Sequence, residues 1–251
     1  MKLFLLDRCV STNILAEEYA REHPDTVALF ISGSQSGGVG RLGRSFSSSE
    51  GGLYMSLLLP GEGRALSDTV GFTAYCALRC AEALEQLCSV PVGIKWVNDL
   101  YLRGRKLGGI ITHGSLSPDG RTLSHMTVGI GINIRNQLPP ELADVAISLK
   151  EAGAPMPSRE ELGREIASRI VNGRAEFLSD SVLQGYRERM LLLGKRVTVY
   201  SAEREFFATV LGVNPDYSLK ILAADGAVRD LYSGEISVRE DSSTNIPVFK
   251  K

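Results

Sequence analysis

The stretch SQSGGVGRLGRSF, residues 34–46, contains four glycines and two arginines. Residues 38–43, GVGRLG, have the G-x-G-x-x-G spacing of a dinucleotide-binding loop. A dinucleotide-binding fold needs a helix directly after this loop, because the helix N-terminus holds the pyrophosphate. Residues 44–52, RSFSSSEGG, are rich in serine and glycine instead. A Rossmann-type oxidoreductase therefore stays only as a distant alternative.

The composition of the loop suggests a different use. Closely spaced glycines let backbone N–H groups approach an anion without obstruction by a Cβ. Arg41 and Arg44 add permanent charge and forked donors that suit phosphate or carboxylate. The alternative is an ordinary surface loop with solvated arginines. We expect an anion-binding loop that is mobile without ligand, because few apolar residues would anchor it.

Composition excludes several classes of protein. The chain has 251 residues, 43% of them hydrophobic, and a net charge of -1. This charge gives no general attraction to nucleic acid or to an anionic membrane. No apolar run reaches the length of a membrane span, and the N-terminus does not resemble a signal peptide. The four cysteines form no CxxC pair, so we expect no zinc site, free thiols and a cytoplasmic location.

Hydrophobic periodicity predicts a mixed α+β domain followed by a small β domain. Helical spacing occurs at 11–22, at 68–88 and after a capping box at Ser158 and Glu161. Beyond residue 190 the pattern changes to short β-like runs separated by turn residues, which predicts a small β-barrel. We expect domains at 1–188 and 189–240 and a flexible tail at 241–251. The strand-like runs are 27–32, 53–60, 92–97, 99–102, 106–112, 123–134, 196–200, 205–213, 218–223, 227–232 and 236–239.

Two further clusters carry groups that suit chemistry. KWVND, residues 95–99, offers the oxygens of Asn98 and Asp99, which a hard cation such as Mg²⁺ accepts. Lys106 opens the apolar run KLGGII and would point one ammonium into a site. The simpler interpretations are a turn between two strands and a lysine at the surface end of a strand. A later run, VGIGINI at 128–134, has glycines that strand packing alone could explain.

These motifs, in this order, resemble the biotin protein ligase family over nearly the whole chain. The resemblance implies a mixed sheet with packed helices, as in the biotin/lipoate ligase-like catalytic domain, and a C-terminal SH3-like barrel. It implies a short form that lacks a DNA-binding domain and has no repressor activity. The motifs are STN at 11–13, Gln35, GVGRLGR at 38–44, KWVND at 95–99, RKLGGII at 105–111, GIGIN at 129–133 and SGEIS at 233–237.

The resemblance also implies a two-step reaction. The carboxylate of biotin attacks the α-phosphate of MgATP, which gives biotinyl-5′-adenylate and pyrophosphate. A lysine of a carrier domain then takes the biotinyl group. Two like charges about 4 Å apart repel by about 4 kcal/mol at an effective dielectric of about 20, so cations must lie between the two anions. By resemblance, Lys106 and Arg41 are the catalytic residues.

The same resemblance assigns the binding residues, with ATP and Mg²⁺ as cofactors and biotin as substrate. Hydroxyl and amide groups are expected around the ureido end of biotin, because burying that end without partners costs a few kcal/mol. Biotin and its adenylate would contact Ser11, Thr12, Asn13, Gln35, Gly38, Val39, Gly40, Arg41, Lys106 and Gly108. The nucleotide and Mg²⁺ would contact Lys95, Trp96, Asn98, Asp99 and Asn133.

Two positions depart from the family pattern. Val39 replaces a common arginine, which removes one charge near the adenylate, and Val97 replaces a common proline. The expected partner is the biotin carboxyl carrier domain of acetyl-CoA carboxylase or a related carboxylase, with a homodimer possible and no nucleic acid or membrane partner. The alternatives are a ligase for lipoate or another acyl acid, and a non-catalytic biotin-sensing protein.

Overall fold

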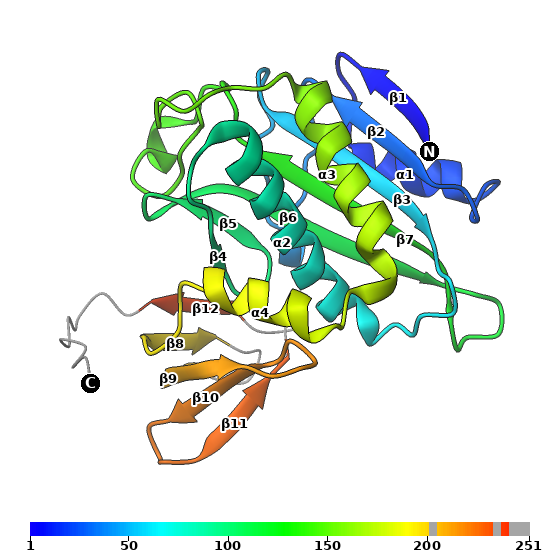
Figure 1. The fold of residues 1–251 in the computed structure, drawn as a ribbon. Helices are drawn as coiled ribbons and strands as arrows, with labels where there is room; N and C mark the ends of the chain where they lie inside the picture. The colour runs from blue at the N-terminus through cyan, green and yellow to red at the C-terminus, as the bar shows by residue number, and fades with distance from the viewer. Residues whose placement is uncertain (201–204, 233–236, 241–251) are drawn as a thin grey trace.

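The computed structural model describes residues 1–200, 205–232 and 237–240, and it contains two sheets (Figure 1). The larger sheet has seven strands in the order β1-β2-β3-β7-β6-β5-β4. Its β1–β2 pair is parallel, and its other neighbouring strands are antiparallel. The predicted mixed sheet is therefore confirmed. The strands are β1 Lys2–Leu6, β2 Ala28–Ser32, β3 Leu53–Pro60, β4 Gly93–Lys95, β5 Asp99–Leu102, β6 Arg105–Leu116 and β7 Leu123–Ile132.

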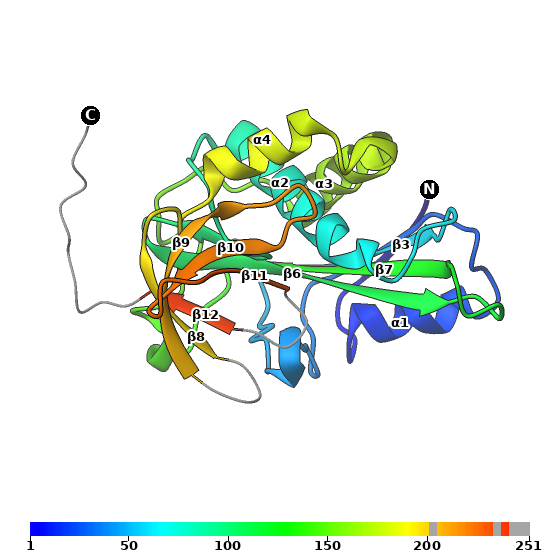
Figure 2. The same cartoon turned by 90° about the horizontal axis from the view of Figure 1, so that it is seen from below.

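Helices cover both faces of this sheet unequally. Figure 2 shows α2, α3 and α4 on one face, which we call the helical face, and α1 on the other, which we call the pocket face. Ser158 caps α3 as predicted, since its hydroxyl accepts from the Glu161 amide at 3.1 Å. The helices are α1 Thr12–Ala20, α2 Asp68–Cys88, α3 Arg159–Gly173 and α4 Asp180–Arg189, with 3-10 turns η1 Arg41–Gly43, η2 Pro140–Leu142 and η3 Arg174–Glu176.

Side-chain alternation along β7 separates the contents of the two faces. Met126, Val128 and Ile132 are fully buried in the main apolar core. The glycines between them, Gly129 and Gly131, face α1 and the glycine loop on the opposite side. The long helices thus complete the apolar core on the helical face. On the pocket face, the missing side chains of Gly129 and Gly131 leave room for Asn13 and Phe46.

The smaller sheet is antiparallel and follows α4, in the order β11-β10-β9-β8-β12. This confirms a small β domain at the C-terminal end of the chain. Its apolar side chains, including Val197, Tyr217 and Leu219, belong to the same core cluster as those of α2 and the large sheet. The domain limits at 188 and 240 stay a prediction. The strands are β8 Arg196–Tyr200, β9 Glu205–Val213, β10 Leu219–Ala223, β11 Val228–Leu231 and β12 Ser237–Glu240.

The structure corrects some expected elements. β1 and α4 were not predicted, the strand expected at 92–97 ends at Lys95, and the helix expected at 11–22 covers Thr12–Ala20.

Among the described helices, none combines the length and apolarity needed to cross a membrane. Within the described ranges, no His, Cys, Asp and Glu side chains gather as a set for a metal ion. The expected tail at 241–251, and residues 233–236 of the SGEIS motif, lie outside the described residues.

Candidate active site

A cavity of about 560 Å³ opens on the pocket face of the large sheet. Its walls come from the N-terminus of α1, the glycine loop, the segment between β4 and β5, and the floor strands β6 and β7. The predicted site residues that line it are Ser11, Thr12, Asn13, Gln35, Val39, Gly40, Arg41, Lys95, Trp96, Asn98, Asp99 and Lys106. The structure thus brings together most of the residues that the motifs indicated.

The wall at α1 is a connected set of hydroxyl and amide groups. The side-chain oxygen of Gln35 accepts from the backbone N–H of Thr12 at 2.8 Å and from its hydroxyl at 3.1 Å. Gln35 therefore satisfies one of the helix amides that have no partner within the helix. Ser11 occupies the N-cap position, but within the described chain its hydroxyl caps no helix amide. The predicted hydroxyls thus lie at the cavity, held by the loop as well as by the helix.

Ser56 supports this wall from below and was missed by the sequence interpretation. Its side chain is fully buried, and its Oγ lies 2.8 Å from Thr12 Oγ1 and 2.5 Å from Asn13 Oδ1. A serine hydroxyl carries one proton, so it donates to one of these two atoms at a time. The signal was available, because Ser56 is a small polar residue inside the apolar run LYMSLLLP at 53–60.

The glycine loop folds back on itself as a small hairpin. Val39 and Ser45 form an antiparallel bridge, and the Gly40 amide donates to the Arg44 carbonyl at 2.7 Å. A Cβ on Gly38 would lie 2.4 Å from the Ser48 hydroxyl oxygen, so this position needs glycine. Phe46 lines the cavity and packs edge-on to Tyr54, which is an apolar anchor that we had not expected. Mobility of the loop without ligand stays a prediction.

Two cations contact the end of the segment between β4 and β5 and the first residue of β5. Arg41 donates from Nη1 to Asn98 Oδ1 at 2.9 Å, and Lys106 Nζ lies 2.7 Å from Asp99 Oδ1. Burial lowers the pKa of Arg41, and the nearby Asp99 carboxylate opposes that shift. The Asn98 amide group also donates to the Ile110 carbonyl at 2.8 Å, which ties the segment to the floor. The site therefore offers cations and hard oxygen donors within one cavity.

Glycines in the floor leave room for these groups. A Cβ on Gly109 would lie 3.2 Å from Asp99 Oδ1 and 3.4 Å from Lys106 Nζ. On the neighbouring strand, a Cβ on Gly129 would lie 2.4 Å from the Asn13 side chain. The glycines of the GIGIN motif therefore serve the site as well as the sheet.

Three predicted contacts lie outside the cavity lining. Gly108 lets β6 approach β7, since a Cβ there would lie 2.4 Å from the Gly131 carbonyl oxygen. Asn133 is buried and donates to the Ile147 carbonyl at 3.2 Å, so it supports the loop that follows β7. Gly38 lies at the base of the hairpin, where its carbonyl accepts from the Phe46 amide at 2.9 Å. Arg44, which the glycine-loop motif indicated, also lines the cavity, together with residues outside the motifs, namely Phe46, Tyr101, Leu142 and Val145.

Comparison with known proteins is consistent with this geometry. The biotin/lipoate A/B protein ligase family matches residues 6–133, slightly more than half of the chain, and the chain belongs to that family. The bifunctional ligase/repressor BirA of Bacillus subtilis is 27% identical over 240 residues, which cover 91% of this chain and 71% of that protein. The biotin–[acetyl-CoA-carboxylase] ligase of Mycobacterium tuberculosis is 31% identical over 129 residues, 49% of this chain and 45% of that one.

Solved structures extend the likeness to the whole fold. The biotin protein ligase of Aquifex aeolicus, in complex with biotin and ATP, is 29% identical with a TM-score of 0.80. The comparison covers 96% of this chain and 99% of that one. The small β domain is therefore part of the shared architecture.

Proposed function

We propose that this protein is an ATP-dependent biotin–protein ligase that forms biotinyl-5′-adenylate and transfers the biotinyl group to a lysine of a carrier domain. The observation that carries the proposal is the cavity itself. It has a hydroxyl and amide wall at one side and two cations, Arg41 and Lys106, at the other. Two relatives that match over most of the chain, one named a ligase/repressor and one a biotin protein ligase, support the same assignment.

The first step joins two anions, which explains the cations. A carboxylate oxygen of biotin attacks the α-phosphorus of ATP, and the bond to the bridging oxygen breaks as pyrophosphate leaves. Arg41 and Lys106 reduce the repulsion between carboxylate and triphosphate and hold both in position. Asp99 has an exposed fraction of 26% and faces the cavity, so its carboxylate fits a Mg²⁺ ion carried by ATP. Such an ion would neutralise phosphate charge.

The second step uses the mixed anhydride as an acyl donor. The amine of the carrier lysine attacks the acyl carbon, the carbon–oxygen bond to the phosphate breaks, and AMP leaves with the electron pair as the amine loses its proton. The carrier that we propose is the biotin carboxyl carrier domain of a carboxylase. A cytoplasmic location is part of the proposal, in keeping with the buried free thiols of Cys76, Cys80 and Cys88. A homodimer stays a prediction.

The polar wall favours biotin over lipoate. The ureido group of biotin offers N–H donors and a carbonyl acceptor, which match the oxygens of Thr12, Gln35 and Ser11. The dithiolane ring of lipoate offers no comparable partners, so it would leave buried polar groups unpaired, which costs about 1–3 kcal/mol for each group.

The test is transfer of labelled biotin to a biotin carboxyl carrier domain, with and without MgATP. We expect labelling that requires ATP and that falls about 100- to 1,000-fold in Lys106→Ala. Lys150→Ala is the control, because Lys150 is an exposed lysine outside the cavity lining. Binding of biotin without any labelling would indicate a sensor, and binding of lipoate in place of biotin would indicate the other acyl-acid ligase.

A further inference from the structure

The segment Trp96–Asn98 joins β4 to β5 and is buried although it forms no strand. The exposed fractions of Trp96, Val97 and Asn98 are 5%, 1% and 7%. Its front side meets the cavity through the Arg41–Asn98 hydrogen bond. Its position therefore depends on what holds it from behind.

Two buried tyrosines make the contacts behind this segment. The hydroxyl of Tyr186, on α4, donates to the Val97 carbonyl at 3.1 Å. The indole N–H of Trp96 donates to the carbonyl of Tyr217, in the turn before β10, at 2.9 Å. The two tyrosine rings pack against each other edge to face, with centroids 5.5 Å apart. A continuous contact thus runs from the small β domain through α4 to the cavity wall.

The Tyr186 hydroxyl is well suited to act as a fixed donor. Tyr186 is fully buried, and burial raises its pKa well above the ordinary value, so the hydroxyl keeps its proton. Arg187, the next residue on α4, donates to the Val213 carbonyl at 3.0 Å, which fixes the helix to the small sheet. The Tyr186 hydroxyl is therefore positioned by α4, which is itself fixed to the small sheet.

We infer that Tyr186 is a positioning residue for the nucleotide side of the site, and that the small β domain acts on the reaction through the Tyr217 carbonyl. The inference rests on the ligase function proposed above. Tyr186 holds the main chain of Val97, and this sets where the next residue, Asn98, presents its oxygen to Arg41. Thr12 and Gln35 of the opposite wall are held by each other and by Ser56, and these hydrogen bonds do not involve Tyr186.

The chain offers a matched control. Tyr75 is also fully buried, and its hydroxyl donates to the Ile170 carbonyl at 2.8 Å, between α2 and α3. Tyr186→Phe and Tyr75→Phe thus remove the same group from the same kind of bond. Only the first change touches the segment Trp96–Asn98.

The experiment is biotin-dependent exchange between ATP and pyrophosphate, together with calorimetric binding of biotin alone. For Tyr186→Phe we expect the KM for ATP to rise about tenfold, which is the typical loss for one buried hydrogen bond, with unchanged affinity for biotin. Tyr75→Phe should leave both values unchanged. An equal rise in KM for the two variants, or no rise in Tyr186→Phe, would overturn the inference.

A separate substitution tests the role of the small β domain. Trp96→Phe keeps an aromatic ring but removes the donor to the Tyr217 carbonyl. We expect its KM for ATP to rise, again with normal affinity for biotin. Because Trp96 itself lines the cavity, we also expect faster amide exchange across 96–99 without ligand, which reports the lost contact with the β domain. An unchanged KM in this variant would remove the β domain from the proposal.

A second measurement needs no ligand and separates this inference from the proposed function. The Ile110 amide donates to the Asn98 carbonyl at 3.0 Å, so its hydrogen exchange reports on the segment. Exchange at Ile110 and across 96–99 should be about tenfold faster in Tyr186→Phe than in Tyr75→Phe. Absence of pyrophosphate exchange in the wild type would refute the ligase function. Equal amide exchange in Tyr186→Phe and Tyr75→Phe would refute the role of Tyr186, whatever the result for the ligase function.

Discussion

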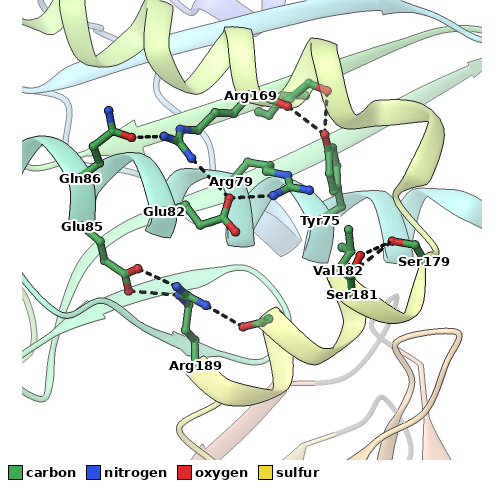
Figure 3. A network of polar contacts seen from close by, with 12 residues as sticks. Tyr75, Arg79, Glu82, Glu85, Gln86, Arg169, Ser179, Ser181, Val182 and Arg189 are labelled. Carbon is green, nitrogen blue, oxygen red and sulfur yellow. Dashed lines mark hydrogen bonds and ion pairs between the residues drawn. The ribbon is translucent and has the colours of Figure 1, made fainter.

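The two faces of the seven-stranded sheet are made by the same strands and contain opposite chemistry. The helical face holds the apolar core, and charged side chains join the helices at its outer surface. Figure 3 shows that network, in which Glu82 accepts from Arg79 on α2 and lies near Arg169 of α3, while Glu85 pairs with Arg189 of α4. The pocket face instead has glycines, hydroxyls and amides.

This difference shows how one strand can serve stability and binding together. Residues of β7 alternate between the faces, so each core residue lies next to a residue that borders α1 or the cavity. The charged side chains of the helical face pair with one another. On the pocket face, Arg41 and Lys106 are paired with Asn98 and Asp99 at the edge of a cavity, where a substrate can compete for them.

The largest effect on stability should come from the core side of β7. Ile132 is fully buried, and Ile132→Ala should lower the free energy of unfolding by about 2–5 kcal/mol, because it removes packed methyl groups and leaves a cavity. Urea unfolding measures this loss. The affinity of the folded variant for biotin should stay normal. A parallel loss of biotin affinity would show that the two faces are not independent.

The neighbouring residue should show the opposite result. A Cβ on Gly131 would lie 2.5 Å from the Phe46 ring, so Gly131→Ala should displace the glycine loop. Overpacking costs about 1–3 kcal/mol, and because the loop can move, we expect most of this cost as roughly tenfold weaker binding of biotinyl-adenylate.

Equilibrium binding and urea unfolding of Gly131→Ala together make the test. Gly212→Ala in β9 is the control, because a Cβ there meets no atom of the described residues within 4 Å. A large fall in stability with normal binding would contradict the division between the faces.

The smallest effect concerns a charged contact on the pocket face. Glu17 of α1 lies 3.1 Å from the His125 ring, and this hydrogen bond is the main reason that the pKa of Glu17 is lowered from 4.5. A lowered pKa in the folded state adds stability above the unfolded value near 4.5, and this stability is lost as the pH falls through the folded value.

Glu17→Gln should therefore be slightly less stable than the wild type at pH 6, and the difference should disappear on acidification below pH 4.5. Solvent screening keeps the effect below about 1 kcal/mol, since the Glu17 side chain is 35% exposed. Denaturant unfolding at several pH values measures it. A difference that grows as the pH falls would reverse the sign and contradict the assignment.

Much of the site could be predicted from the sequence, because its motifs are local. Lys106, Asp99 and Asn98 lie within twelve residues of each other in the chain, and β5 and β6 bring them together as a hairpin. The glycine loop was also recognisable, although the anchor at Phe46 was not. That anchor depends on Gly131, a residue far away in the sequence that only the sheet brings near.

The residues that could not be predicted act through long-range packing. Tyr186 and Tyr217 resemble ordinary core residues in the sequence, and their partners lie on other elements. Ser56 stands out as a serine in an apolar run, but its partners Thr12 and Asn13 also lie on another element. β1 was missed because five residues carry little periodicity, and its parallel partner β2 is separated from it by a helix. Asn133 was placed in the site because it belongs to a motif, but its bonds are to the loop after β7.

The acceptor that Tyr217 offers to Trp96 has an evolutionary consequence, because it is a main-chain carbonyl that every residue possesses. The shape of the turn presents this carbonyl to Trp96. In that turn, Tyr217 has a left-handed backbone with φ +63°, and its amide donates to the Asn214 carbonyl at 3.0 Å. Substitutions elsewhere in the small β domain leave this acceptor in place as long as the turn keeps its form. Two descendants of one ancestor can therefore differ widely in the sequence of this domain and still share its contact with Trp96.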